Sequence, residues 1–200
     1  ERKFRNDSNV TLKQGSLVEL PCGDREFDAA TCNQVVHHLA SGEELNQFDG
    51  IQEFAHEAFR VLRPGGAFVL NTSSPEQQTN GFWWASLIPE AIGKLGKRFP
   101  EIEMIREMLI EAGFEIGKTT VMKGEVLQGD DYLDPKGPLS ANWRNGDSAW
   151  SLVEPEELAK AMEHVTEMNA AGSMQSYQDD REALRCKIGQ TTSISAFRPV

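Results

Sequence analysis

The sequence predicts an α/β fold with a mostly parallel sheet. Three observations support this prediction. Strand-like apolar segments alternate along the chain with amphipathic helix-like segments, which is typical of α/β proteins. The segment "AFVLN" has almost no polar alternation, as expected of a parallel strand buried on both faces. The chain has 200 residues, of which 39% are hydrophobic, and this suits a single domain over residues 1–200 with one sizeable core.

The apolar patterning predicts five strands and three helices along the chain. Strands are expected at residues 10–15, 27–36, 67–73, 114–124 and 189–197, and helices at 42–63, 101–112 and 155–171. Val10 and Leu12 alternate with polar residues in the first strand, which ends near Gly15. The second strand is the apolar run "FDAATCNQVV". The first helix has apolar residues at three- and four-residue steps, with Ser41 as its expected N-cap and Pro64 as its stop.

The later elements have clear boundary signals. Gly113 stands where the helix at 101–112 is expected to end. Pro155 is at the first position of the next helix, where proline is tolerated, and Gly172 ends it. The chain closes with the strand "GQTTSISAF".

Composition excludes several functions. The formal net charge of −11 argues against a nucleic-acid backbone or an anionic membrane as partner. Three cysteines without paired spacing favour neither a disulfide framework nor a zinc site, and no other residue group has metal-ligand spacing. No run approaches the ~20 apolar residues of a membrane span. The sequence therefore predicts a cytoplasmic protein without a bound metal.

A ligand site is expected beyond the carboxyl ends of the strands, where open α/β sheets bind their ligands. The segments that leave these ends are "GSLVELP", "NQVVHHL", "NTSSPEQQTNGFWW" and the long stretch after "TTVMKG". Ser16, Asn33 and Gln34 could hydrogen-bond an adenine or a carboxylate there. The alternative for each of them is simple capping of a strand end.

The same segments resemble a known family. Gly15, Leu20-Pro21, Phe27-Asp28, His37-His38 and Leu62-Arg63-Pro64-Gly65-Gly66 occur in the order and at spacings similar to those of class I S-adenosylmethionine-dependent methyltransferases of the broad type 11 group. The resemblance covers residues 10 to 122. It implies a Rossmann-like sheet whose last strand is antiparallel, S-adenosylmethionine as cofactor, and methyl transfer to a small molecule.

The resemblance also assigns cofactor-binding residues. Gly15, Ser16 and Leu17 would contact the adenine, with Ser16 at a position that is usually acidic, so we expect weaker adenine selectivity. Asn33, Gln34 and His38 would lie near the sulfonium. His37 or His38 could be a catalytic base, because imidazole titrates near neutral pH; the alternative is a packed structural histidine.

The glycine-rich motif of the family is missing. The sequence has no GxGxG, and Gly65-Gly66 follows a helix rather than a strand. The first nine residues resemble the end of the helix before the family's third strand, so we expect an N-terminally truncated domain that binds the cofactor poorly. An uncovered strand edge would favour a homodimer that covers it.

Two aromatic-rich segments are expected to form the substrate side of the site. The candidate substrate-binding residues are Trp83, Trp84, Tyr132, Trp143, Arg144 and Trp150, the last four within an insertion at about 125–187. They suggest an apolar, aromatic or cation-accepting cavity; the alternatives are a small core beneath a long loop or a partner interface. Arg144 could clamp a substrate carboxylate or pair with Asp147.

Three functions follow from these observations. A methyltransferase acting on a small molecule, possibly as an inactive fragment, is the leading hypothesis. A non-catalytic, methyltransferase-like remnant that binds a ligand or partner is the main alternative. A dehydrogenase is weaker, because the chain has no dinucleotide fingerprint.

Overall fold

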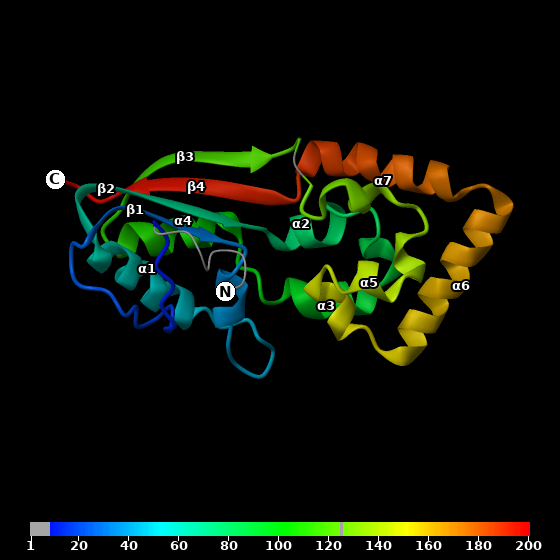
Figure 1. Ribbon diagram of the computed structural model, residues 1–200, viewed down its shortest axis with the longest axis horizontal. Helices are drawn as coiled ribbons and strands as arrows, with labels where there is room; N and C mark the ends of the chain where they lie inside the picture. Colours follow the sequence, from blue (N-terminus) through cyan, green and yellow to red (C-terminus); the bar gives the residue numbers. More distant parts are fainter. Residues whose placement is uncertain (1–8, 125) are drawn as a thin grey trace.

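The computed structural model describes residues 9–124 and 126–200, and its centre is a four-stranded mixed sheet (Figure 1). The strands are β1 (Phe27–Asn33), β2 (Leu62–Thr72), β3 (Glu115–Met122) and β4 (Thr191–Phe197), in the order β1-β2-β4-β3. β1 is parallel to β2, whereas β4 lies antiparallel to both β2 and β3. Three strands therefore run in one direction and the last runs against them, which confirms the predicted antiparallel final strand.

Two helices cover one face of the sheet. These are α1 (Asp49–Val61) and α4 (Ile102–Glu111), which lie together below the strands in Figure 1. Phe54 of α1 and Leu109 of α4 are buried in one cluster with Phe68 and Leu70 of β2. Phe68 stacks on Phe114 with ring centroids 5.5 Å apart. This burial of apolar side chains holds the helix layer against the sheet.

A second group of helices lies beyond the carboxyl end of β2. Its α-helices are α2 (Pro75–Asn80), α3 (Pro89–Gly96), α5 (Ala141–Arg144), α6 (Pro155–Ala171) and α7 (Met174–Ile188). Short 3-10 helices join them: η3 (Ala85–Leu87), η4 (Gly129–Leu133), η5 (Gly137–Leu139) and η6 (Ser148–Leu152); η2 (Val36–Leu39) follows β1. Figure 1 shows α6 along the outer edge of this group and α7 returning toward β4. The group has a hydrophobic cluster of its own, which contains Trp83, Ile88 and Val165.

The expected strand at residues 10–15 is wrong. Residues 10–15 have no strand structure, and the nearest bridge joins Ser16 to Glu19 within one turn. The alternation of Val10 and Leu12 fails to make a strand because a strand needs a neighbour, and both side chains remain exposed, at 37% and 55%.

The start of the first helix also differs from the prediction. α1 begins at Asp49 rather than at residue 42, with Phe48 at the N-cap position. Ser41 instead exchanges two backbone hydrogen bonds with Gln47, of 2.8 and 3.1 Å, which hold residues 41–47 in a turn. Pro64 lies within β2, because α1 passes directly into that strand at Leu62.

The remaining boundary signals are confirmed. α6 begins with Pro155, and Gly172 follows it in the left-handed region at φ +70°. Gly113 after α4 has φ +105°, a conformation that favours glycine.

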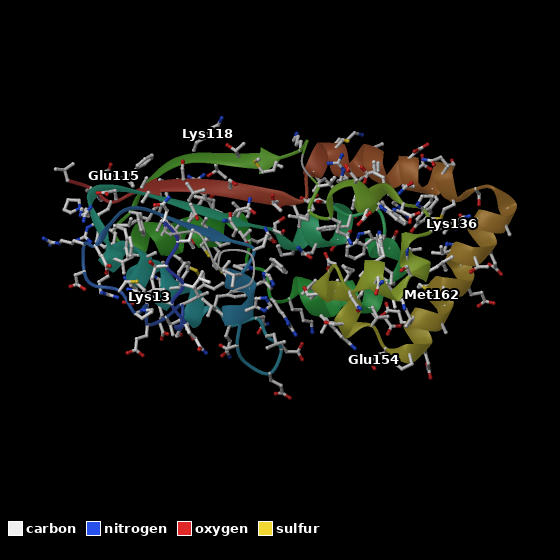
Figure 2. The ribbon with its side chains drawn as sticks, in the orientation of Figure 1. Lys13, Glu115, Lys118, Lys136, Glu154 and Met162 are labelled. Carbon is white, nitrogen blue, oxygen red and sulfur yellow. The ribbon has the colours of Figure 1, made fainter. Side chains whose placement is uncertain are left out.

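The two edges of the sheet differ. β1 pairs only with β2 among the described strands, so its outer edge is open. β3 forms the opposite edge, where the exposed Lys118 lies at the margin of the molecule (Figure 2). A lysine on an edge strand discourages pairing with another chain. Among the described helices, none is long and apolar enough to cross a bilayer.

Candidate functional site

The exit of β1 is a sharp turn anchored to β2. Gln34 has φ +50°, which is uncommon for a residue other than glycine, and it turns the chain from β1 toward η2. Asn71 of β2 fixes this turn: its carbonyl oxygen accepts from the Gln34 backbone N–H at 2.9 Å, and its side-chain oxygen accepts from Gln34 Nε2 at 2.9 Å. The polar segment predicted at the carboxyl end of β1 is therefore a hydrogen-bonded turn, and Asn33 is exposed at the end of the strand.

η2 presents the histidine pair immediately after this turn. His37 is 6% exposed and stacks on Phe99 with ring centroids 4.5 Å apart. Burial, together with the nearby His38 and Arg98, lowers the pKa of His37 to about 4. His37 is thus neutral at pH 7, and its buried Nδ1 has no hydrogen-bond partner among the described residues. An unpaired buried nitrogen is costly, so it marks a place where a polar ligand atom would be stabilised.

A cavity of about 230 Å³ opens beside this pair. Its lining residues come from the β1 exit, from the segment after β2, and from the long segment between β3 and β4 (residues 123–124 and 126–190), called the excursion below. They are Gln34, His37, His38, Gln78, Phe82, Leu95, Phe99, Leu127, Gln128, Gly146, Asp147 and Ser148. One part of the wall is apolar, and the rest carries amide, imidazole, hydroxyl and carboxyl groups. The excursion therefore covers the carboxyl end of the sheet, and the cavity can hold a small ligand with both apolar and hydrogen-bonding groups.

Asp147 is the acidic residue of this lining. Its Oδ1 accepts a hydrogen bond from the Ala149 backbone N–H at 2.8 Å, at the start of η6. Burial raises the pKa of Asp147 above its ordinary value. The expected pair with Arg144 does not form: Arg144 donates to the Pro138 carbonyl oxygen at 2.6 Å. Sequence reasoning missed Asp147 as a site residue, because only the path of the excursion brings it to His37.

The three residues expected at the adenine do not line this cavity. Ser16 Oγ accepts a hydrogen bond from the Val18 backbone N–H at 3.3 Å. Leu17 packs against the sheet core. A Cβ built on Gly15 would lie 2.5 Å from Pro21 Cδ, so close packing explains this glycine. Their part in cofactor binding stays a prediction.

The aromatic residues expected to contact substrate form the second core instead. Trp83 and Tyr132 are fully buried, and Trp84 and Trp150 are 1% and 7% exposed. Trp143 is partly buried against the same cluster. This arrangement corresponds to the alternative of a small core beneath a long loop, and none of these residues lines the cavity. Direct substrate contacts by them, or by Arg144, stay predictions.

Two of these aromatic residues nevertheless shape the site. Trp83 Nε1 donates to the Tyr132 carbonyl oxygen at 2.6 Å, and the Trp83 backbone N–H donates to the Tyr132 hydroxyl at 3.0 Å. Trp84 Nε1 donates to Gln128 Oε1 at 2.9 Å, which orients a residue of the cavity wall.

Within residues 9–124 and 126–200, no group of three or more His, Cys, Asp or Glu side chains is placed to hold a metal ion.

The α/β arrangement, with a mixed sheet in which β4 is antiparallel to its neighbours, is consistent with a Rossmann-like methyltransferase fold. A family model described as a methyltransferase domain matches residues 1–70. A curated protein of Mycolicibacterium smegmatis, named a probable S-adenosylmethionine-dependent methyltransferase, is 32% identical over 115 residues, which are 55% of this chain and 37% of that protein. A demethylmenaquinone methyltransferase of Staphylococcus saprophyticus is 28% identical over 149 residues, which are 63% of this chain and 58% of the relative.

A solved structure is also similar in fold. It is that of a candidate methyltransferase of an antibiotic biosynthesis pathway from Anabaena variabilis, with a TM-score of 0.71 and 18% identity, covering 92% of this chain and 72% of the other. Together these findings show that the chain is similar to S-adenosylmethionine-dependent methyltransferases over residues 1–70 by the family model, and over 55% and 63% of its length by the two curated relatives. The matches span only 37% and 58% of the two curated relatives' lengths.

The described residues fit one end of the family's cofactor, S-adenosylmethionine, rather than the whole molecule. The neutral His37 and the Gln34 amide suit the neighbourhood of a sulfonium cation, because neither carries a positive charge. The cavity of about 230 Å³ is smaller than the ~300–1,000 Å³ of typical ligand pockets. Its single carboxyl group, on Asp147, belongs to the excursion and not to the sheet.

Proposed function

We propose that this chain supplies the substrate side of a methyltransferase site that acts on a small molecule. The observation that carries the proposal is the cavity that joins Gln34 and His37, at the β1 exit, to Gln128 and Asp147 in the excursion. A cavity of this size suits a small organic compound and not a folded macromolecule. The relative named for demethylmenaquinone supports the same substrate class.

The residues around the cavity have separable roles. When bound, S-adenosylmethionine supplies an activated methyl group. Phe82, Leu95 and Phe99 exclude water and contact the apolar part of a substrate. Asp147 accepts a hydrogen bond from a substrate O–H or N–H group and can take up its proton, because burial has raised the pKa of this carboxyl.

The histidines differ in basicity. With a pKa of about 4, His37 is a weak base, and its Nδ1 is better suited to hydrogen-bonding a ligand than to removing a proton. His38 is exposed and lines the same cavity, so His38 is the second candidate for the base, after Asp147.

Titration of S-adenosylhomocysteine, followed by ligand-observed NMR, tests the proposal. We expect saturable binding with a Kd near 1 mM, on the order of −4 kcal/mol, because only one end of the ligand is held. His37→Phe keeps the stack on Phe99 but removes Nδ1, and should weaken binding about tenfold. His56→Phe is the control, because His56 lies on the exposed side of α1, contacts Gln52 and does not line the cavity. Equal binding by the two variants would refute the proposal.

The non-catalytic alternative has a specific observation in its favour. The lining of the cavity offers no carboxylate from the sheet for the ribose hydroxyl groups, so the chain could hold a small ligand and no cofactor. Absence of any S-adenosylhomocysteine signal, together with binding of small aromatic compounds at His37 and Phe82, would favour this alternative.

We further propose a homodimer across the open edge of β1, and a cytoplasmic location. The unpaired backbone groups of β1 and the 37% exposure of Phe27 support pairing with a second copy. Sedimentation equilibrium tests this, and a monomer at all micromolar concentrations would contradict it. The free cysteines Cys22, Cys32 and Cys186 support a reducing compartment, which cell fractionation can check.

A further inference from the structure

A second cavity, of about 250 Å³, lies between α2, α3 and α7. The apolar part of its lining is formed largely by Phe82, Pro89, Ile92 and Leu184, and the polar part by Thr79, Asn80, Ser86 and Arg181. Phe82 is the one residue that it shares with the cavity at His37. This second cavity is therefore separate from the proposed methyltransferase site and has a different chemical character.

Arg181 of α7 is the one charged residue in its lining. The guanidinium lies 5.4 Å from the centre of the Tyr177 ring, and no carboxylate among the described residues pairs with it. The residues one helical turn away on α7 are Tyr177, Gln178, Leu184 and Arg185, so none of these neighbours is acidic.

Arg181 shares the lack of an ion pair with most other basic side chains of the described residues, so its relevance lies in its place in the wall of a cavity. Arg60 and Arg185 each pair with a glutamate three residues away on the same helix, at 2.6 and 2.7 Å. Arg181, by contrast, is half-buried and lines this largely apolar cavity. A positive charge in such surroundings stabilises an anion that enters it.

We propose that this cavity binds a small carboxylic acid with an apolar body. Arg181 would hold the carboxylate, because a guanidinium matches the planar geometry of that group with two parallel hydrogen bonds. Phe82, Ile92 and Leu184 would bury the apolar body. A doubly charged phosphate suits the cavity less well, since Arg181 is its only cation. The inference does not depend on methyl transfer, because His37 and Asp147 take no part in it.

Benzoate is the probe, titrated into the chain and followed by ligand-observed NMR. We expect saturable binding at a Kd below about 10 mM, and at least tenfold weaker binding by Arg181→Gln. Arg181→Lys keeps the charge and should retain much of the affinity. Benzamide, which has the same shape without the charge, and acetate, which has the charge without the ring, should each bind at least tenfold more weakly.

Two glycines of α3 locate the bound probe. Gly93 lines the cavity and Gly96 does not, and a Cβ built on either meets no heavy atom within 4 Å. Gly93→Leu should abolish benzoate binding by occupying the cavity, while Gly96→Leu makes the same change on the same helix and should leave binding intact. Because a Cβ at either position meets no heavy atom within 4 Å, both variants should fold.

Four results would overturn the proposal. They are no saturation by benzoate up to about 10 mM, equal binding of benzoate and benzamide, unchanged affinity in Arg181→Gln, and equal affinities in the Gly93 and Gly96 variants. A loss of S-adenosylhomocysteine binding in His37→Phe without change in benzoate binding would show that the two sites are independent.

Discussion

The hydroxyl of Tyr132 should be a major contributor to the stability of the second core. It donates to Glu182 Oε1 at 2.6 Å and accepts from the Trp83 backbone N–H at 3.0 Å, within a fully buried side chain. Tyr132→Phe removes both hydrogen bonds and leaves the ring in place. The bond to a charged carboxylate contributes about 1.5–3 kcal/mol, and a buried N–H without a partner costs about 1–3 kcal/mol.

Glu182 keeps its pair with Arg185 at 2.7 Å, which offsets part of this loss. We therefore expect Tyr132→Phe to lower the free energy of unfolding by about 3 kcal/mol, which for a chain of this size is a fall in Tm of about 6–12 °C. Urea and thermal unfolding followed by tryptophan fluorescence measure this directly, since Trp83 adjoins the site.

Tyr177→Phe is the matched control, because Tyr177 is the second of the chain's two tyrosines and its hydroxyl pairs with Ser86 Oγ on an exposed surface. Its loss should cost less than about 1 kcal/mol. A change in Tyr132→Phe as small as that of the control would refute the stabilising role assigned to the Tyr132 hydroxyl.

Three further predictions concern buried titratable groups. Glu157→Ala should lower the free energy of unfolding by about 2 kcal/mol, because the Glu157 carboxylate accepts a hydrogen bond of 2.7 Å from the Glu90 backbone N–H at the start of α3. Glu156→Ala, at an exposed position on the same helix turn, is the control, and chemical denaturation compares the two variants. Burial raises the pKa of Cys32 to about 12, so a disulfide reagent at pH 8 should label the exposed Cys186 at once and Cys32 only after unfolding; labelling at comparable rates would contradict this. The pKa of His37 falls from 6.5 to about 4 on folding, so the unfolded chain binds more protons than the folded chain between these pH values. The free energy of unfolding should therefore fall by up to about 3 kcal/mol as the pH drops from about 6.5 to 4, and denaturation at stepped pH should show a weaker decline in His37→Phe.

Local signals predicted some helices well and others not at all. α6 has both a Pro155 start and a Gly172 stop, and its apolar stripe reaches the second core at Val165. α7 has no such stripe: its buried residues are Met174, Gln178 and Arg185, two of them polar. Hydrogen bonds to distant carbonyl oxygens explain the burial of these two, since Gln178 donates to Leu133 and Arg185 to Lys123. No periodicity in the sequence contains that information.

The residues of the candidate site were likewise predicted only in part from the sequence. Gln34, His37 and His38 were predicted, because they follow a recognisable strand and strand ends are where α/β sheets bind ligands. Gln128 and Asp147 were missed as site residues, because they are at least 90 positions further along the chain. Their place in the cavity depends on the path of the excursion between β3 and β4.

The sequence by itself determined the alternation of strands and helices and the methyltransferase resemblance, and it predicted the exit of β1 as a candidate ligand-binding end, because each depends on the spacing of residues along the chain. Only the tertiary structure decided that the tryptophan-rich segments form a core, that Asp147 lines the same cavity as the histidine pair, and that Arg181 lines a largely apolar cavity. These features depend on contacts between distant residues, and a burial pattern of that kind is settled by packing rather than by local propensity.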